Sequence, residues 1–366
     1  MSLKNILRIL VLTLLVTSCA GSNTQDIKQA PTNLSVNAQI TGLSDSTLNG
    51  DGSGTVNFVI SAKNATSYLV QTDGKTFVIN DKAGGTVNYT YTSQPGQIAT
   101  YTVMVAAYND NIHKDTTFQV SVYYKQQYTL KWSDEFDGTS LNANNWSVET
   151  NTHVNNELET YTSSGNYSIA NGALTITCKK VNNDGVYGSY TSARLNTSGK
   201  ISFKYGRLEA RLKLPKGKGT WPAFWMLGES IGTGTAWPKC GEIDIMEYVG
   251  VDPLWVQGSL HSQSYYGSNS KNGRYQLPST NNEAEWHVYG LLWDTNKISF
   301  YVDDYTKPYY TYFAPSIKTA DNWPYDNNFF VILNFAFGGD WGGYAGIDKT
   351  LDNMTYQIDW VRYYAQ

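Results

Sequence analysis

The chain has 366 residues, of which only 16% are charged and 14% are aromatic, and its formal net charge is -4. This length exceeds the ~100–250 residues of one compact unit, so we expect two or more domains. The weak negative charge and the scattered Lys and Arg residues exclude the basic surface that nucleic-acid binding requires, and they disfavour a strongly polyanionic substrate. Tyr, Thr, Val, Asn and Gly dominate over helix formers, which predicts an all-β protein.

Residues 1–19 have the organisation of an export signal. The apolar run Ile9–Val16 follows two basic residues and is too short to span a bilayer. Small residues then lead to Cys19, and this pattern resembles a bacterial lipobox, in which cleavage leaves the cysteine as a lipidated N-terminus. An ordinary signal peptide with an incidental cysteine is the alternative. The lipobox interpretation predicts a membrane-anchored lipoprotein, in the outer membrane or at the cell surface, with residues 20–30 as a flexible tether.

Residues 31–125 are expected to form a small separate domain. Apolar and polar residues alternate over Val56–Ala62, Val87–Tyr91 and Tyr101–Ala107, and turn-forming residues lie between these runs. About seven short strands in ~95 residues are typical of an Ig-like β-sandwich, and the segment resembles a PKD-type module. All 11 Trp residues lie beyond residue 130, so this module lacks clustered rings for stacking on sugars. We therefore expect a spacer rather than a glycan-binding module.

A larger unit follows over residues 128–366. Alternation recurs along it, which predicts an antiparallel β-sandwich of two sheets in a single domain. Its two cysteines, Cys178 and Cys240, either pair or stay as buried thiols, and the sequence leaves both possibilities open. The alternating runs are Gly206–Leu214, Ile298–Val302, Phe329–Phe335 and Tyr356–Tyr364.

The segment Glu242–Glu247 concentrates three carboxyl groups within six residues. On a strand, Glu242 and Asp244 share one face, and the isoleucines beside them share the other. Strict alternation would send Glu247 into the apolar interior, where an unpaired carboxylate costs several kcal/mol. One extra residue at Ile245-Met246, a β-bulge, restores the parity. We therefore predict a bulge here and three carboxyl groups on one face.

Three neighbouring carboxyl groups repel one another, and this repulsion separates their pKa values. Retaining hydrolysis of a glycosidic bond needs that separation, because one carboxylate attacks the sugar while a carboxylic acid protonates the leaving oxygen. We assign Glu242 as the nucleophile, Glu247 as the acid/base and Asp244 as the group between them that holds or shares a proton. The two glutamate carboxyls must then approach to ~5–5.5 Å, which requires strand curvature and inward-leaning side chains. A Ca²⁺ site or an acidic solvated face is the alternative.

The same segment resembles the catalytic signature of glycoside hydrolase family 16. It has the form with two residues between the aspartate and the second glutamate, as in laminarinases and lichenases; xyloglucan transglycosylases lack the extra residue. The resemblance implies a concanavalin-like jelly roll and an endo-acting, retaining hydrolase of β-1,3-glucan such as laminarin, or of mixed β-1,3/1,4-glucan. Other matching segments, in order along the chain, are Trp132–Phe136, Asn155–Leu158, Phe203–Arg207, Trp221–Met226 and Ile358–Arg362.

Aromatic residues near the acidic strand predict a sugar-binding surface. Trp221 and Trp225 share one strand face, with Ala223 between them, so they form a flat apolar floor for sugar rings unless both fill the core. The resemblance supports the first interpretation, because these tryptophans line the sugar subsites of the family. His261 lies on the next expected strand, where we expect it beside Glu247 and within reach of the departing sugar. A purely structural histidine is the alternative.

The resemblance also implies weaker candidates. Arg194, Asn155 and Trp341 would contact sugar hydroxyls and rings, with Trp341 on a glycine-rich loop tip, and a structural role is the alternative for each. The hydrolysis needs no metal or other cofactor, and no Cys/His cluster has the spacing of a zinc site. Family members often hold a structural Ca²⁺ on the face away from the active site. The resemblance implies Glu135 and Asp359 as its side-chain ligands here.

Two further functions compete with a β-glucanase. One is a non-catalytic glycan-binding surface lipoprotein on the same fold, which the complete acidic trio disfavours. The other is the same enzyme type acting on a galactan such as agarose or carrageenan, whose sulfates would call for Arg and Lys beside the motif. We expect a monomer with a polysaccharide substrate, no nucleic-acid partner, and contact with the membrane only through the lipid at Cys19. Linkage preference and the number of subsites stay open.

Overall fold

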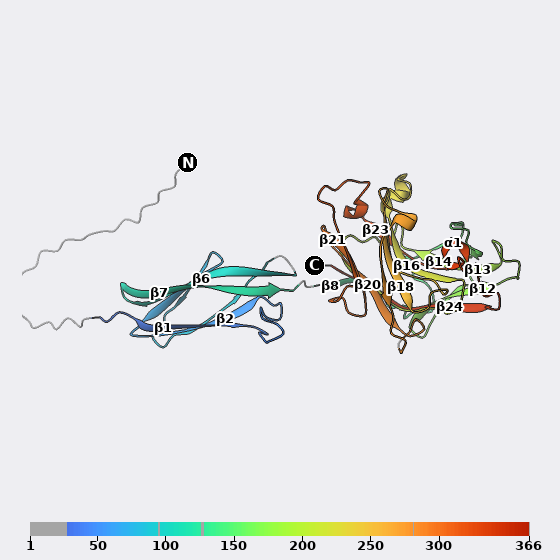
Figure 1. The fold of residues 1–366 in the computed structure, drawn as a ribbon. Helices are drawn as coiled ribbons and strands as arrows, with labels where there is room; N and C mark the ends of the chain where they lie inside the picture. Colours follow the sequence, from blue (N-terminus) through green and yellow to red (C-terminus); the bar gives the residue numbers. More distant parts are fainter. Residues whose placement is uncertain (1–27, 94–95, 126–127, 281, 366) are drawn as a thin grey trace, which may run out of the picture. The chain divides into compact units, whose positions relative to one another are not determined.

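The computed structural model divides the chain into two compact units, with the boundary between residues 126 and 127 (Figure 1). The expected export signal, Cys19 and most of the tether fall outside the described residues, so lipid anchoring stays a prediction. Among the residues that are described, no helix is long and apolar enough to cross a membrane. The structure describes residues 28–93, 96–125, 128–280 and 282–365.

In its described residues, 28–93 and 96–125, the first unit contains seven strands in two antiparallel sheets, which face each other in Figure 1. One sheet has the order β1-β2-β5 and the other the order β4-β3-β6-β7. Side chains from both sheets, such as Phe58, Val70 and Val105, form one buried core. This architecture has the strand number expected from the sequence, and the Ig-like assignment stays a prediction. The strands are β1 (Thr32–Ile40), β2 (Thr55–Lys63), β3 (Ser67–Thr72), β4 (Lys75–Ile79), β5 (Gly85–Thr90), β6 (Gln97–Asn109) and β7 (Ile112–Tyr124).

The second unit is a jelly-roll sandwich of a ten-stranded and a seven-stranded sheet, which confirms the expected fold class. The ten-stranded sheet has the order β10-β13-β12-β24-β15-β20-β21-β22, with β11 paired to β12 and β8 paired to β24. Its strands are β8 (Thr129–Asp134), β10 (Glu159–Tyr161), β11 (Tyr167–Ala170), β12 (Ala173–Lys180), β13 (Tyr190–Ser192), β15 (Gly206–Lys213), β20 (His287–Trp293), β21 (Lys297–Val302), β22 (Tyr310–Phe313) and β24 (Asn353–Ala365).

The seven-stranded sheet carries the acidic segment on a strand near its middle, in the order β19-β18-β17-β16-β23-β14-β9. In the part of the second unit that the structure describes, helical structure is confined to short pieces. The strands are β9 (Ser147–Glu149), β14 (Arg194–Asn196), β16 (Thr220–Gly228), β17 (Glu242–Tyr248), β18 (Trp255–His261), β19 (Lys271–Gln276) and β23 (Phe329–Phe337). The short helices are η1 (Glu229–Thr233), η2 (Gly267–Asn269), η3 (Pro324–Asp326) and α1 (Gly339–Gly342).

The large hydrophobic core of the second unit draws residues from both sheets. Leu208 and Leu212 of β15 join Phe224 of β16 and Ile243 of β17 in one buried cluster. Because side chains alternate along a strand, the intervening residues of the seven-stranded sheet project away from this core. We call that second face the outer face. It carries the acidic groups described below.

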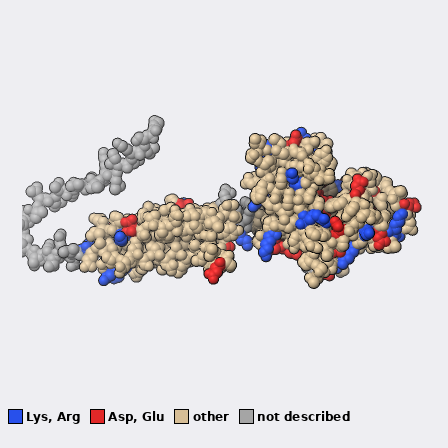
Figure 2. All heavy atoms as spheres, viewed as in Figure 1, with Lys and Arg blue, Asp and Glu red and all other residues tan. Residues whose placement is uncertain are grey.

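Both cysteines of the second unit are free thiols. Cys178 lies in the large core, whereas Cys240 packs in a smaller cluster with Leu227 and Ile332. The disulfide left open by the sequence is therefore absent. On the surface of this unit, acidic and basic side chains are interspersed among uncharged ones in the view of Figure 2.

Candidate active site

The predicted β-bulge is present in β17. On one side, Asp244 pairs with Ser259 and Glu247 pairs with Gln257, so two residues of β17 face the single Gly258 of β18. On the other side, the register with β16 also shifts at this point. The bulge restores the parity of the strand, and it places Glu242, Asp244 and Glu247 on the outer face.

The residues between the acids belong to the core. Ile243, Ile245 and Met246 are at most 1% exposed and lie in the large hydrophobic cluster. Gly241 precedes the strand with a φ of 84°, and a Cβ there would come within 2.9 Å of the Phe329 ring. A glycine is required at this position because the backbone is left-handed and its neighbours leave no room for a side chain. The left-handed backbone of Gly241 thus leads directly into β17, which begins at Glu242.

The three carboxyl groups are poorly solvated, although they lie on an outer face. The side chain of Glu242 is 15% exposed and that of Asp244 is 5% exposed. Burial, followed by the charge of Asp244, raises the pKa of Glu242 to about 8. Burial also holds the pKa of Asp244 well above its usual value, and burial together with Asp244 does the same for Glu247. The trio therefore retains protons at neutral pH that isolated carboxyls would release.

His261 approaches the acidic trio at a different point from the one expected. It is the pairing partner of Glu242 in β18, and its Nε2 lies 3.1 Å from Asp244 Oδ2 and 3.7 Å from Glu242 Oε1. The expectation that it lies beside Glu247 was wrong, because β18 runs antiparallel to β17 and its end meets the beginning of the acidic strand. Gln257 takes the place beside Glu247.

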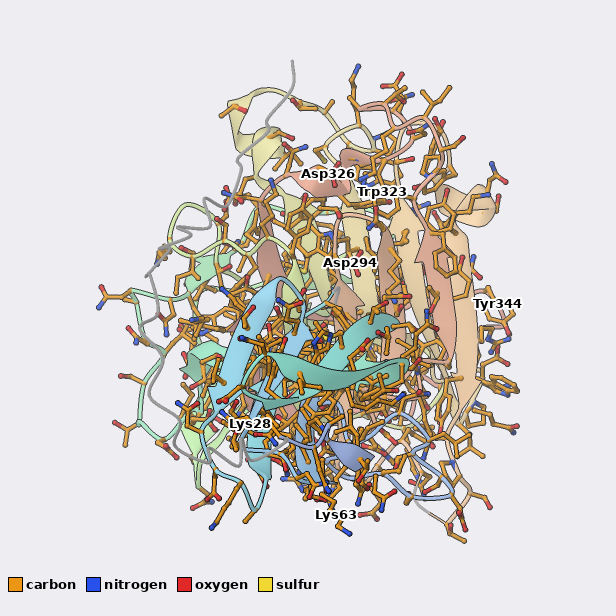
Figure 3. The ribbon with its side chains drawn as sticks, turned by 90° about the vertical axis from the view of Figure 1, so that its left-hand side faces the viewer. Lys28, Lys63, Asp294, Trp323, Asp326 and Tyr344 are labelled. Carbon is orange, nitrogen blue, oxygen red and sulfur yellow. The ribbon has the colours of Figure 1, made fainter. Side chains whose placement is uncertain are left out.

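Two contacts hold His261, one at its ring and one at its backbone. The backbone N–H of Gly267 donates to Nδ1 over 3.1 Å, so the neutral ring carries its proton on Nε2 and directs it at the carboxyls. The Tyr325 hydroxyl donates to the backbone carbonyl of His261 over 2.9 Å. Tyr325 belongs to η3, next to the hydrogen bond of 2.9 Å from Trp323 Nε1 to Asp326 Oδ1 (Figure 3). His261 is thus held with Nε2 facing Asp244 and Glu242.

Trp237 is a site residue that the sequence reasoning missed. Its Nε1–H donates to Glu242 Oε2 over 3.0 Å, and its ring centroid lies 6.2 Å from that of His261 and 5.5 Å from that of Tyr266. The Trp237 side chain is 44% exposed, which is unusual for a residue so large. The available signal was a tryptophan five residues ahead of the acidic strand.

Trp221 and Trp225 both project from β16 onto the outer face, as predicted. Phe224 and Met226, which alternate with them, are fully buried. The indole N–H of Trp221 donates to Glu247 Oε1 over 3.2 Å. The ring of Trp341, in α1, meets the Trp221 ring edge to face at 5.5 Å. Trp341 therefore extends the aromatic surface beyond the acid/base candidate.

Arg194 and Asn334 hold Trp225 from two sides. The Arg194 guanidinium lies 4.8 Å from the centre of the Trp225 ring and donates to Glu149 over 2.9 Å. Asn334 Oδ1 accepts the indole N–H of Trp225 over 2.8 Å and was not identified from the sequence. Asn334 in turn donates to the buried Tyr161 hydroxyl over 3.0 Å. Arg194 is mostly buried, so in this structure it supports the aromatic ring.

Asn155 lies at the rim of the same face, next to the loop of Trp341. Its backbone carbonyl accepts the N–H of Asp340 over 2.8 Å, and its side-chain amide donates to Glu157 over 3.2 Å. Asn155 is exposed, so its amide is accessible to a ligand. The structure thus brings Asn155, Trp341, Trp221, Trp225 and the acidic trio together on one side of the sandwich.

The two carboxylates expected to hold calcium are engaged elsewhere. Glu135 accepts two hydrogen bonds from Arg362, at 3.0 and 2.8 Å, and Asp359 accepts one from Arg211 at 2.6 Å. These are ion pairs with two separate arginines, and the structure does not gather the carboxylates into a metal-ligand cluster. Within the described residues, three metal-ligating side chains meet only at Glu242, Asp244 and His261. A structural calcium stays a prediction.

A jelly roll with two glutamates on the outer face of an internal strand, a buried aspartate between them and tryptophans alongside has the apparatus of a glycosidase. One glutamate can attack a sugar and another can donate a proton, while flat indole rings hold the pyranose faces. This arrangement defines the class of protein as a carbohydrate-cleaving enzyme.

Comparison with known proteins identifies the family. The profile of glycosyl hydrolases family 16 matches residues 155–362, and the chain belongs to this family. A curated relative, the "Beta-glucanase" of Rhodothermus marinus, is 39% identical over 249 residues, which cover 64% of this chain and 84% of the relative. The matched residues 155–362 lie entirely within the second unit.

Solved structures agree with this assignment. The laminarinase from Flavobacterium sp. UMI-01 superposes with a TM-score of 0.59 at 40% identity, over 65% of this chain and all of that one. The laminarinase catalytic domain from Thermotoga maritima MSB8 superposes with a TM-score of 0.60 at 39% identity, over 66% of this chain and 99% of that one.

Proposed function

We propose that this chain is an endo-acting, retaining β-glucanase that cleaves β-1,3-glucan or mixed β-1,3/1,4-glucan. The observation that carries the proposal is the bulge in β17, which turns Glu242, Asp244 and Glu247 to the same outer face. The names of the relatives, a beta-glucanase and two laminarinases, support the substrate class. The aromatic and amide side chains around the trio suit neutral sugars better than sulfated galactans.

In the first step, a carboxylate oxygen of Glu242 attacks the anomeric carbon while Glu247 protonates the departing glycosidic oxygen. The product is a glycosyl ester on Glu242, and the leaving sugar carries away the proton of Glu247. In the second step, Glu247 takes a proton from water, the hydroxide attacks the anomeric carbon, and Glu242 is released. The configuration at that carbon is inverted twice and so retained.

The environment of each carboxyl fits its role. Burial and the neighbouring Asp244 raise the pKa of Glu247, so this group holds the proton that it must donate. The pKa of Glu242 is raised as well, but His261 and the hydrogen bond from Trp237 act in the opposite direction and favour its ionised form. Asp244 lies between them with His261 Nε2 at 3.1 Å, where it holds a proton close to the nucleophile.

Separate loss of the two glutamates tests these roles. Glu242→Ala and Glu247→Ala should each lower reducing-sugar release from laminarin and barley glucan by ~10³-fold or more. With an aryl glycoside whose leaving group needs no protonation, Glu247→Ala should recover activity and Glu242→Ala should not. Unchanged thermal unfolding of both variants is the control.

The stereochemistry gives an independent test. Proton NMR of the first product formed from laminarin should show the β-anomer, because two displacements restore the original configuration. Initial α-anomer would contradict the assignment of Glu242 as nucleophile. Wild-type protein that binds laminarin without cleaving it would favour the non-catalytic alternative, and release from agarose or carrageenan alone would favour the galactan alternative.

We also propose the setting in which the enzyme acts. Lipidation at Cys19 would anchor the protein to the outer membrane or the cell surface, and the first unit would serve as an Ig-like spacer in front of a monomeric catalytic unit. The lipobox-like residues before Cys19 support the anchor. The two-sheet, seven-stranded architecture of the first unit supports the Ig-like assignment. Globomycin-sensitive processing and mass spectrometry of the mature N-terminus would test the anchor.

A further inference from the structure

Two glutamates outside the acidic trio are buried in contact with each other. Glu157 is 4% exposed and Glu159 is 1% exposed. They lie two residues apart and so project to the same side of the chain, and their side chains are hydrogen-bonded. Two ionised carboxylates repel each other and accept hydrogen bonds without donating any. The contact between Glu157 and Glu159 therefore requires a proton.

The hydrogen bonds around the pair show which glutamate carries that proton. The Glu157 carboxyl accepts the Asn155 amide over 3.2 Å and the Tyr161 hydroxyl over 3.4 Å. Glu159 Oε2 accepts the backbone N–H of Phe337 over 2.7 Å, whereas Glu159 Oε1 is buried and accepts none from the described residues. Burial, followed by the charge of Glu157, holds the pKa of Glu159 well above its usual value. Glu159 is thus the protonated member, and its O–H donates to the Glu157 carboxylate.

The other titratable and charged groups near the pair do not take over the role of this proton. Burial holds the pKa values of Tyr161 and Cys178 well above their usual range, so both groups stay neutral. Arg194 attracts the Glu157 carboxylate, but its guanidinium already pairs with Glu149. The groups that face the pair from the surrounding segments are Tyr161 of β10, Cys178 of β12, Arg194 of β14, His153 of the preceding loop and Asp340 of α1.

The pair joins two segments that carry candidates for sugar binding. Glu157 accepts the side-chain amide of Asn155. Glu159 accepts the backbone N–H of Phe337, the last residue of β23, and Trp341 follows shortly after it in α1. The backbone carbonyl of Asn155 in turn accepts a hydrogen bond from α1. The two glutamates therefore hold the Asn155 loop and the start of the Trp341 loop together.

We infer that Glu157 and Glu159 share one proton and act as positioning residues, which hold Asn155 and Trp341 in place for a sugar chain. The inference rests on the proposed function, because the pair acts on the substrate only through these two segments. Loss of the shared proton leaves two negative charges in contact away from water, and their repulsion separates the segments. Binding of the sugar should therefore weaken as the pH rises.

The affinity for laminarihexaose, measured by calorimetry in a Glu242→Ala background that does not cleave it, tests the pair. The Kd of this parent protein should increase above neutral pH, by up to ~tenfold per pH unit once the shared proton is lost. Glu159→Gln keeps the shape, donates an amide N–H to Glu157 and has no proton to lose. Glu157→Gln likewise leaves one charge at every pH. Both Gln variants should match the parent at pH 6 and bind more tightly than the parent at pH 9.

Thermal unfolding gives a readout that does not depend on sugar. A carboxyl whose pKa is raised in the folded state stabilises the protein at low pH, and this contribution is lost as the pH rises through the raised value. The Tm of Glu159→Gln should therefore increase relative to that of the wild type as the pH rises. Glu209→Gln is the matched control, because Glu209 is also buried and accepts a tyrosine hydroxyl but faces Arg207 rather than a second glutamate.

The control should match the parent in Kd at both pH values. Equal Kd values of the parent and both Gln variants at pH 9 would overturn the inference, and so would loss of folding in both variants, since an amide should replace the shared proton. A wild-type protein that leaves laminarihexaose intact would instead overturn the proposed function, and the Tm comparison would still test the shared proton.

Discussion

At the scale of single residues, the chemistry of the site depends on which groups donate hydrogen bonds to the acidic trio. Burial alone favours the protonated form of all three carboxyls, which would leave the nucleophile neutral. Trp237 and His261 oppose this effect at Glu242. Because the carboxyls interact strongly, the pKa values that activity reports belong to the trio as a whole rather than to one residue.

Trp237→Phe tests this balance. The substitution keeps an aromatic ring but removes the N–H that stabilises the Glu242 carboxylate, so the pKa of Glu242 should rise. The nucleophile would then ionise only at higher pH. The acidic limb of the pH profile of kcat/KM should move upward by ~0.5–1 pH unit, as expected for the loss of one hydrogen bond to a charged group.

A Trp286→Phe variant is the control for the loss of an indole N–H, because Trp286 lies just before β20 of the ten-stranded sheet, with its ring 5.0 Å from the Arg211 guanidinium. Its pH profile should coincide with that of the wild type. If Trp237→Phe lowered kcat/KM equally at every pH, Trp237 would serve only to contact the sugar, and its role in the ionisation of Glu242 would be refuted.

At the scale of one element, β17 must pair with a strand on each side. It must also place its apolar side chains in the core and its acidic side chains on the outer face. Ile245 is the residue that both neighbours leave without a direct pairing partner, and its side chain still fills the core. Gly258 lies opposite the bulge, and a Cβ there would come within 2.6 Å of the Phe300 ring. The bulge thus depends on glycine in β18 as well as on the extra residue in β17.

Two single-residue deletions distinguish this residue from its neighbours. Without Ile245, regular alternation still places all three acids on the outer face, so the protein should fold, with a Tm about 5–10 °C lower because a buried side chain is lost. Without Ile243, either Glu242 or Asp244 must enter the core, and soluble folded protein should not form.

Thermal unfolding and circular dichroism of the purified variants provide the measurement. Equal stability of the two deletion variants would show that the parity of β17 does not control its register. Reducing-sugar release by the Ile245 deletion variant then shows how much activity remains when Glu247 is one residue closer to Asp244 along the strand.

At the scale of the whole molecule, the two units have separate hydrophobic cores and separate sheets. Every candidate catalytic or sugar-binding residue lies in the second unit, and the match to the family lies there too. Domains with their own cores can in general fold alone. The catalytic unit should therefore not depend on the first unit for its activity.

A protein restricted to residues 128–366 should keep its kcat/KM on soluble laminarin within about twofold of that of the full chain. The same comparison on insoluble curdlan tests whether the first unit binds glycan. Equal rates on curdlan fit a spacer, whereas a selective loss on curdlan would mean that the first unit binds glycan. Loss of activity on soluble laminarin as well would contradict the independence of the two units.

Local rules were sufficient for much of this protein. Alternation and turn residues predicted an all-β chain with a large sandwich, and the parity of Glu242–Glu247 predicted the bulge, because strand periodicity and the cost of burying a charge act within a few residues. The outward faces of Trp221 and Trp225 followed from the same periodicity. The state of Cys178 and Cys240 and the calcium ligands did not follow, because they depend on distances between segments far apart in the chain.

The sequence by itself determined which side chains lie on the same face of each strand, and with them the acidic trio. Only the tertiary structure decided which strands lie side by side and in what register. That register set His261 against Glu242 instead of Glu247. The tertiary structure also placed Trp237, in the connection before β17, within hydrogen-bonding distance of Glu242. The physical reason is that pairing between strands is set by the packing of the whole sandwich, whereas alternation is a property of each strand alone.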